Sequence, residues 1–276
     1  MKLDFVKMSG AGNDFIVLDN RDGSLDGMLR RDFIARICRR GLDIGADGLL
    51  ELRTDYELAF MMKYYNSDGG QAEMCGNGGR CIASYAAMKG IAEEGEAFSF
   101  RSVAGVHRAV VLGPDTARIW MTEPEISFLD RIIELDGAGM SVSFIDTGVP
   151  HAVVLADRTE PPPFESAAPI LRRHPAFGAA GANVDYLWNE GGMLRMRTWE
   201  RGVEGETLAC GTGAVACAIC ANRLMEIEIP VDIAVRSGES LIVGMDGAGW
   251  WLEGEARHVY SGTMETDPSK SLTESH

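Results

Sequence analysis

A short sequence element occurs twice and constrains the fold more than any other feature of this chain. The first copy reads AEMCGNGGRCIASYAAM from Ala72, and the second reads TLACGTGAVACAICANRL from Thr207. Each copy is CGxG followed by small and apolar residues that are compatible with a helix. Cys75 and Cys210 are 135 residues apart, close to half of the 276-residue chain. This spacing predicts two similar domains, each carrying one copy.

Both halves of the chain are rich in strand-like alternation and contain few helical segments, of which RRDFIARICRR is one. A GPDT turn at Gly113–Thr116 is the best candidate for a domain boundary. The run Pro161–Pro163, with the stretch up to Pro175, is expected to be a surface excursion, because proline removes backbone donors. The predicted organisation is an N-terminal domain over 1–115, a C-terminal domain over 116–253 and a flexible tail over 267–276.

The charge balance excludes several classes of protein. Acidic residues outnumber basic ones by 41 to 26, which gives a formal charge of −15 and repels nucleic acid and anionic lipid. No apolar run approaches the ~20 residues that a membrane span needs. The start of the chain, MKLDFVKMSGAGNDF, lacks the apolar core of a signal peptide. We therefore expect a soluble cytoplasmic protein with neither nucleic acid nor membrane as a partner.

The six cysteines are expected to be reduced thiols, because a chain of this size does not need disulfides. Cys217 and Cys220 form a CxxC, but small apolar residues lie between and around them. Their spacing places both on one helix face, so helix packing is favoured over a redox pair. The spacing of Cys75 and Cys81 is unusual for metal ligands, and no Cys/His quartet clusters in the sequence. No metal site is expected.

A cysteine at a glycine-rich helix start has distinctive chemistry. The first N–H groups of a helix are unpaired and the dipole there is positive, which favours a thiolate over a thiol of reference pKa ~8.5. The same amides can bind a carboxylate. Two such elements facing each other would hold one carboxylate while the two sulfurs flank its α-carbon. One sulfur would remove the α-proton and the other would deliver a proton from behind, without pyridoxal phosphate.

Other interpretations of the same residues stay open. Cys75 and Cys210 can be structural residues at tight turns, or the cysteines together can serve a thiol redox or metal-binding protein. A non-catalytic module that binds amino acids would explain the amide groups without needing two thiols. Asn and Asp are also ordinary turn residues, and a Glu-Arg sequence is usually a solvated pair.

Six segments together carry a resemblance to a known family over nearly the full length. They are KMSGAGNDF, IGADGL, NSDGGQAEMCGNGGRC, TGVPHAVV, ANVDY and ERGVEGETLACGTGA. In these segments the chain resembles the diaminopimelate epimerases. The related proline and hydroxyproline racemases carry His after the first CG, where this chain has Asn77. The resemblance implies a cofactor-independent epimerase that interconverts LL- and meso-diaminopimelate for lysine and peptidoglycan precursor synthesis, or acts on a related amino acid.

The resemblance also implies roles for individual residues. The catalytic thiols would be Cys75 and Cys210, supported by His151 and Glu200. Guanidinium fits a carboxylate in a bidentate manner, which suits Arg201 at the distal end of the substrate. The implied substrate contacts are the amides of Gly76, Asn77, Gly211 and Thr212, and the residues Asn13, Asn66, Asn183, Glu200 and Arg201.

Two positions depart from the family pattern. Val149 stands where many members have Asn before the Pro-His pair, and Gly48 stands where many have Gln. Both changes concern recognition of the distal end and leave the thiols untouched. The implied fold is α+β: two pseudo-symmetric α/β domains, each a curled, barrel-like mixed sheet around a central helix, with the active site in the interdomain cleft. A strand over about 254–266 would return to the first domain, and Tyr260 would lie near a homodimer interface.

Overall fold

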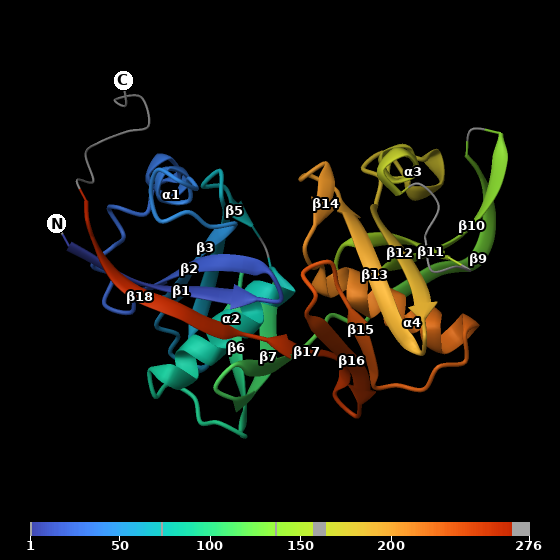
Figure 1. Ribbon diagram of the computed structural model, residues 1–276. Helices are drawn as coiled ribbons and strands as arrows, with labels where there is room; N and C mark the ends of the chain where they lie inside the picture. The colour runs from blue at the N-terminus through green and yellow to red at the C-terminus, as the bar shows by residue number, and fades with distance from the viewer. Residues whose placement is uncertain (1, 73, 136, 157–163, 267–276) are drawn as a thin grey trace. The chain divides into compact units, whose positions relative to one another are not determined.

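The computed structural model describes residues 2–72, 74–135, 137–156 and 164–266. The tail expected at 267–276 and the run Pro161–Pro163 lie outside the described residues. Within the described part, the chain divides into two compact units (Figure 1). The first comprises Met1–Ile119 and the chain from Gly254 onward, and the second comprises Trp120–Glu253. The chain passes between the units inside two strands, β8 (Thr116–Trp120), which follows the GPDT turn, and β17 (Gly249–Glu255).

The first unit is a mixed sheet with two helices. Its strands are paired in the order β18, β1, β2, β3, β4, β6, β7, β8, and the pairs β2–β3 and β4–β6 are parallel. The helix predicted in RRDFIARICRR is confirmed as α1. The elements are β1 (Lys2–Gly10), β2 (Asn13–Asp19), α1 (Arg31–Ile37), β3 (Gly48–Arg53), β4 (Met61–Asn66), β5 (Gln71–Ala72), α2 (Gly76–Met88), β6 (Ala97–Ser102), β7 (Gly105–Gly113), β8 and β18 (Arg257–Glu265).

The second unit has the same plan. Its strands are paired in the order β9, β10, β11, β12, β13, β15, β16, and the pairs β11–β12 and β13–β15 are parallel. The elements are β9 (Glu125–Leu135), β10 (Ala138–Asp146), β11 (Pro150–Leu155), α3 (Phe164–Leu171), the 3₁₀ helix η1 (Pro175–Phe177), β12 (Asn183–Glu190), β13 (Met193–Glu200), β14 (Gly205–Thr207), α4 (Gly211–Leu224), β15 (Val231–Ala234), β16 (Ser240–Asp246) and β17 (Gly249–Glu255).

The two units match strand by strand. From β18 to β7 and from β9 to β16, successive pairs are antiparallel, antiparallel, parallel, antiparallel, parallel and antiparallel. A short extra strand, β5 or β14, pairs with β4 or β13 directly before the CGxG element. The predicted internal repeat is therefore present in the strand order, with the two cysteines at equivalent points.

Each sheet surrounds one helix. In α2 every residue from Gly76 to Ala86 is buried, and the helix contacts β1, β2, β3, β7 and β18. In α4 the residues from Gly213 to Ala221 are buried, and the helix contacts six strands from β10 to β16. A helix enclosed on all sides has no polar face and needs small residues, which explains the Gly, Ala and Cys of both copies. The predicted α+β class with central helices is confirmed.

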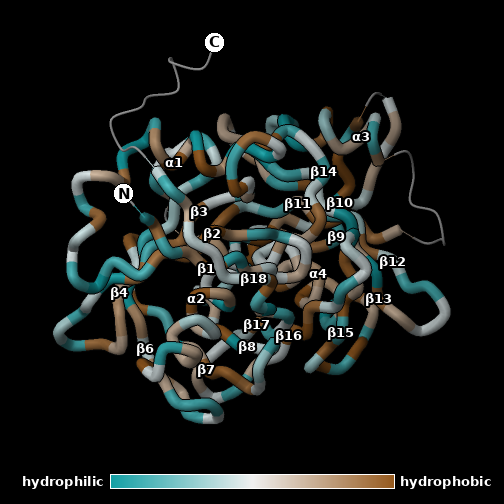
Figure 2. The backbone as a smooth tube through the Cα atoms, turned by 60° about the vertical axis from the view of Figure 1, so that its left-hand side comes forward, coloured by the Kyte–Doolittle hydropathy of each residue, from teal (hydrophilic) through white to brown (hydrophobic). Residues whose placement is uncertain are grey.

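The strands curl around these helices because one of their faces is apolar. Hydrophilic and hydrophobic stretches follow one another along the backbone, as Figure 2 shows, and at the start of β1 charged and hydrophobic residues alternate over Lys2–Phe5. Leu3 and Phe5 are buried in a cluster with α1, whereas Lys2 and Asp4 are exposed. This period of two is the signature of a sheet with one buried face. None of the helices in the described ranges has the length and apolarity required to span a bilayer.

The surface excursion expected up to Pro175 is wrong in its described part. Residues Phe164–Leu171 form α3, and Phe164, Ala168 and Leu171 are buried in the core of the second unit. Pro169 lies inside this helix and removes one backbone hydrogen bond. Burial of the neighbouring apolar side chains offsets that loss. Sequence rules based on local pattern do not take such burial into account.

Candidate active site

Cys75 is the N-cap residue of α2 in the first unit. Its backbone is extended, with φ −132° and ψ 123°, and its Sγ accepts a hydrogen bond from the N–H of Gly78 at 3.4 Å. The thiol is partly exposed. Gly76 and Asn77 follow it in the first turn, where helix amides have no partner within the helix. The thiol therefore adjoins the first turn of a helix, and the binding of an anion by that turn stays a prediction.

Side-chain hydrogen bonds fix the first turn of α2. The Asn77 amide donates to Oδ1 of Asn13 at 2.6 Å, and the Asn13 amide donates to Oδ2 of Asp47 at 3.0 Å. Arg80, which is fully buried, donates from Nη2 to Oδ1 of Asn77 at 2.8 Å. Burial lowers the pKa of Arg80, while the nearby Cys81, Cys75 and Glu255 act in the opposite direction. Asn13 and Asn77 are thus brought together beside a buried cation.

An ion network lies behind Asn13. Lys7 is buried and forms an ion pair with Asp14 at 2.8 Å, and Arg40 pairs with both Asp14 and Asp47. Burial on its own would raise the pKa of the Asp14 carboxyl, but hydrogen bonds from Arg40 and Lys7 outweigh it and hold the pKa at about 2. The network joins the start of β2, which carries Asn13, to the residue before β3, Asp47.

Asn66 lies at the end of β4, opposite Gly48 of β3, and its side chain is exposed. A Cβ built on Gly48 would lie 2.6 Å from the carbonyl oxygen of Tyr65 and 2.7 Å from the ring of Tyr64. No side chain fits there without a shift of the neighbouring strand. The Gly48 departure is therefore a packing requirement of this chain.

Cys210 is the N-cap residue of α4 in the second unit, with φ −128° and ψ 111°. Its thiol is 7% exposed, and Sγ lies 3.4 Å from Oγ1 of Thr212. Burial, together with the negative charges of Glu200 and Asp185, raises the pKa of Cys210 well above its ordinary value. The lowered thiol pKa expected at this helix start is therefore wrong for Cys210, because burial outweighs the effect of the helix end.

His151 of β11 lies at the centre of a buried hydrogen-bonded chain. Its Nδ1 is 2.6 Å from Oδ2 of Asp185, and both side chains are fully buried. Its Nε2 is 2.9 Å from Oγ1 of Thr212 and 3.4 Å from the Asn183 amide. Thr198 donates to the other oxygen of Asp185 at 2.6 Å. The chain links the strands β11, β12 and β13 to the first turn of α4.

The remaining predicted residues of the second unit lie near this chain. Asn183 accepts a hydrogen bond from the backbone N–H of Arg201 at 2.8 Å, and a guanidinium nitrogen of Arg201 donates to the carbonyl of Gly181 at 3.3 Å. Glu200 is the last residue of β13, and its charge acts on Cys210. Val149 directly precedes β11 and is partly buried.

The alternative chemistry for the cysteines finds little support. Cys217 and Cys220 are fully buried in α4, and burial raises the pKa of Cys217 well above its ordinary value and that of Cys220 to about 12. Such thiols pack as small apolar residues. All six cysteines are free. Among the described residues, no group of three or more His, Cys, Asp or Glu side chains is placed to hold a metal ion.

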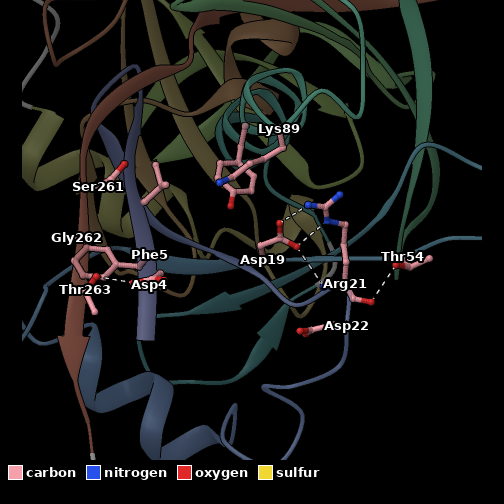
Figure 3. A pocket seen from close by; sticks show the side chains of 12 residues that line it. Asp4, Phe5, Asp19, Arg21, Asp22, Thr54, Lys89, Ser261, Gly262 and Thr263 are labelled. Carbon is pink, nitrogen blue, oxygen red and sulfur yellow. Dashed lines mark hydrogen bonds and ion pairs between the residues drawn. The ribbon is translucent and has the colours of Figure 1, made fainter. Parts of the chain in front are cut away.

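A cavity of about 790 Å³ opens elsewhere on the first unit (Figure 3). It is lined by residues of β1, β2 and β18 and by Tyr85 and Lys89 at the end of α2. Asp19 and Arg21 in its wall pair with each other at 2.7 Å. None of the predicted site residues lines it. Its size alone gives no reason to prefer it over the thiol-bearing turns.

Sequence reasoning missed Asp185, Thr198 and Arg80. The only local signal for Asp185 is its place in ANVDY, two residues after Asn183 and hence on the same face of an otherwise apolar strand. Arg80 lies within GNGGRC, where a charged residue in a run of small residues is the only cue.

The family model described as diaminopimelate epimerase matches residues 5–125 and 143–259. A protein named diaminopimelate epimerase from Chlorobaculum tepidum is 40% identical and covers 93% of this chain and 99% of its own length. One of the same name from Aquifex aeolicus is 35% identical and covers 96% and 99%.

Solved structures share the fold at low identity. A Bacillus anthracis protein of the phenazine biosynthesis PhzF family superposes with a TM-score of 0.70 at 11% identity, covering 96% of this chain and 100% of its own. A probable proline racemase from Agrobacterium radiobacter gives 0.69 at 15%, covering 97% and 94%. These two show the fold alone. The matches of family model and sequence extend over nearly the whole chain, and on that evidence the chain belongs to the diaminopimelate epimerase family.

Proposed function

We propose that this protein is an isomerase that interconverts LL- and meso-diaminopimelate without a metal or organic cofactor, in the synthesis of lysine and peptidoglycan precursors. One observation carries the proposal. Two helices at equivalent points of a strand-by-strand repeat each begin with a cysteine as N-cap, and each cysteine is followed by a glycine-containing turn. Epimerisation at one carbon needs such a pair, because a proton leaves one face and returns to the other.

In the proposed mechanism, Cys75 and Cys210 serve opposite faces of the α-carbon. The amides of Gly76, Asn77, Gly211 and Thr212 hold the reacting carboxylate and stabilise the negative charge that develops on it. Preorganised donors of this kind are worth roughly 3–4 kcal/mol each in a water-excluded site. That stabilisation replaces the electron sink that a cofactor would otherwise supply.

The distal amino-carboxylate end would be bound by Asn13, Asn66, Asn183 and Arg201, with Glu200 and His151 supporting the reacting centre. Asn13 contacts Asn77, and Asn183 contacts His151 and the Arg201 backbone, so each asparagine lies beside another residue of the proposed site. With Val149 unable to donate from its side chain, Asn183 and Arg201 would carry more of the recognition.

We further propose that the protein acts in the cytoplasm as a homodimer of two-domain subunits, with Tyr260 near the interface. Tyr260 of β18 is 42% exposed, and its ring lies edge-on to Phe5 at 5.9 Å. An exposed aromatic on an edge strand is a common interface feature. Sedimentation of the wild type and of Tyr260→Ala would test it, and an unchanged monomer in both would contradict it.

The decisive experiment for the activity is incubation with LL-diaminopimelate in deuterated water. The proposal predicts α-deuteration of the product together with appearance of the meso isomer in chiral analysis. A redox protein or a binding module would leave the α-hydrogen in place. The double variant Cys75→Ala, Cys210→Ala is the matched control, and exchange that persists in it would have to come from another source.

A further inference from the structure

The two thiols differ in what lies two residues further along the helix. After Cys75 that residue is Asn77, whose amide is held by Asn13 and Arg80. After Cys210 it is Thr212, whose hydroxyl lies 3.4 Å from Sγ and 2.9 Å from Nε2 of His151. A hydroxyl can rotate and change from donor to acceptor towards the same neighbour, which an amide fixed by two partners cannot do.

The direction of the hydrogen bonds in the second unit follows from Asp185. An ionised carboxylate only accepts, so Nδ1 of His151 carries a hydrogen. The Asn183 oxygen accepts from the Arg201 N–H, so its NH2 group faces Nε2 of His151, and Nε2 acts as an acceptor. The Thr212 hydroxyl gives its single hydrogen to Nε2. Towards the sulfur it therefore presents a lone pair, and Cys210 completes the chain only if it carries a hydrogen.

We propose that Asp185, His151 and Thr212 form a positioning chain for Cys210, in which Asp185 favours the protonated thiol until the substrate takes its proton, and the Thr212 hydroxyl then donates to the thiolate that remains. This inference rests on the proposed function, in which Cys210 is a proton carrier. It assigns to Asp185 a role in the reaction although it touches neither thiol nor substrate. It also distinguishes the two thiols, because Asn77 has no hydroxyl to play the part of Thr212.

The chain also accommodates the state that follows proton transfer. The S–H bond of Cys210 breaks, its electron pair stays on sulfur, and the carbanion pair of the substrate forms the new C–H bond. The Thr212 hydroxyl can then turn from Nε2 to the thiolate. Nε2 keeps a donor in the Asn183 amide at 3.4 Å. The other ionisable groups that act on Cys210 are Glu200, from the end of β13, and Asp185.

Alkylation of Cys210 by iodoacetamide tests the chain without substrate. The rate is followed against pH by peptide mass spectrometry, with Cys75 in the same digest as internal reference. In Asp185→Asn, the new amide can donate to Nδ1, which reverses the hydrogen bonds and removes a charge, so Cys210 should react faster by about tenfold at fixed pH, equivalent to about one pKa unit. In Thr212→Val, the thiolate loses its donor, and Cys210 should react several-fold more slowly.

The opposite changes in alkylation rate expected for Asp185→Asn and Thr212→Val distinguish positioning from loosened packing. Loosened packing would expose Cys210 and speed its alkylation in both variants. Thr212→Ser should keep the wild-type profile. Thr147→Val is the matched control, because Thr147 is a buried threonine whose hydroxyl donates to the Thr212 carbonyl at 3.1 Å, away from the Thr212 hydroxyl. An effect of Thr147→Val as large as that of Thr212→Val would overturn the proposal. A change of the alkylation rate in the same direction in Asp185→Asn and Thr212→Val would also overturn it. If Asp185→Asn does not fold, the comparison of Thr212→Val with Thr212→Ser decides alone.

The outcomes also separate this inference from the proposed function. If the wild type leaves diaminopimelate unchanged while alkylation shifts as expected in the variants, the proposed function is wrong and the proposed positioning chain is supported. An active wild type with unshifted alkylation in the variants would contradict the proposed positioning chain of Asp185, His151 and Thr212 and would support the proposed function.

Discussion

Replacing Gly213 by alanine tests how firmly Asp185 is held against α4. A Cβ at Gly213 would lie 2.5 Å from Oδ1 of Asp185 and 3.1 Å from its Cγ. That oxygen accepts the hydrogen bond from Thr198, and the other oxygen contacts Nδ1 of His151. Because both oxygens are engaged, Asp185 cannot move aside without losing a partner.

The expected free-energy change is the balance of two terms. Alanine in place of glycine inside a helix stabilises by about 1 kcal/mol on propensity alone. Relief of the clash costs about 2–3 kcal/mol, either as an overpacked core or as a broken hydrogen bond to a buried carboxylate. We therefore expect Gly213→Ala to lower the free energy of unfolding by about 1–2 kcal/mol, with the clash outweighing the propensity.

Urea unfolding followed by circular dichroism measures this change. Gly79→Ala in α2 is the matched control, because the close contacts of a Cβ there would be with the tips of flexible side chains, Met74 at 2.6 Å and Ile119 at 3.3 Å, and the Phe100 ring lies at an ordinary 3.8 Å. The control should stay within about 0.5 kcal/mol of the wild type or exceed it. If Gly213→Ala proves as stable as the wild type, the carboxylate is not held as described, and the reasoning is refuted.

Three further predictions follow from the site. Cys75→Ala and Cys210→Ala should each abolish epimerisation with the fold intact, since each face of the carbon needs its own proton carrier, and near wild-type turnover in either would exclude the two-base mechanism. The lowered pKa of Asp14 should contribute stability above about pH 4 that is lost as the pH falls towards 2. The difference in free energy of unfolding between the wild type and Asp14→Asn, measured in urea, should therefore vanish between about pH 4 and about pH 2. Turnover should survive exhaustive dialysis against a chelator and need no added pyridoxal phosphate, and loss of activity that metal restores would count against this.

The sequence was sufficient for the features that depend on local pattern and on the repeat. CGxG predicted two helix starts, the 135-residue spacing predicted two similar halves, and both are present in the strand order. Small residues after each cysteine made sense once each helix proved to be enclosed by its sheet. These features are set by neighbours in the chain, which a pattern records directly.

The features that were missed depend on contacts across the sheet. Asp185 meets His151 because the parallel register of β11 and β12 pairs His151 with Asn183, and no local rule sets that register. The pKa of Cys210 depends on burial and on two distant carboxylates, neither of which a helix-start motif reports. Pro169 inside α3 is a further case, since the packing that stabilises the helix comes from strands distant in sequence.

The pairing of β1 with β18 has a consequence for how the chain is made. Lys2 pairs with Glu265 and Ser9 with Arg257, so β1 leaves the ribosome long before its partner strand β18 has been synthesised. The second unit, continuous from Trp120 to Glu253, has its own sequence complete earlier. Contacts of such separation are slow to form and leave an unpaired strand edge open meanwhile. A nascent chain of this protein should therefore carry one folded half and one half that needs protection from aggregation.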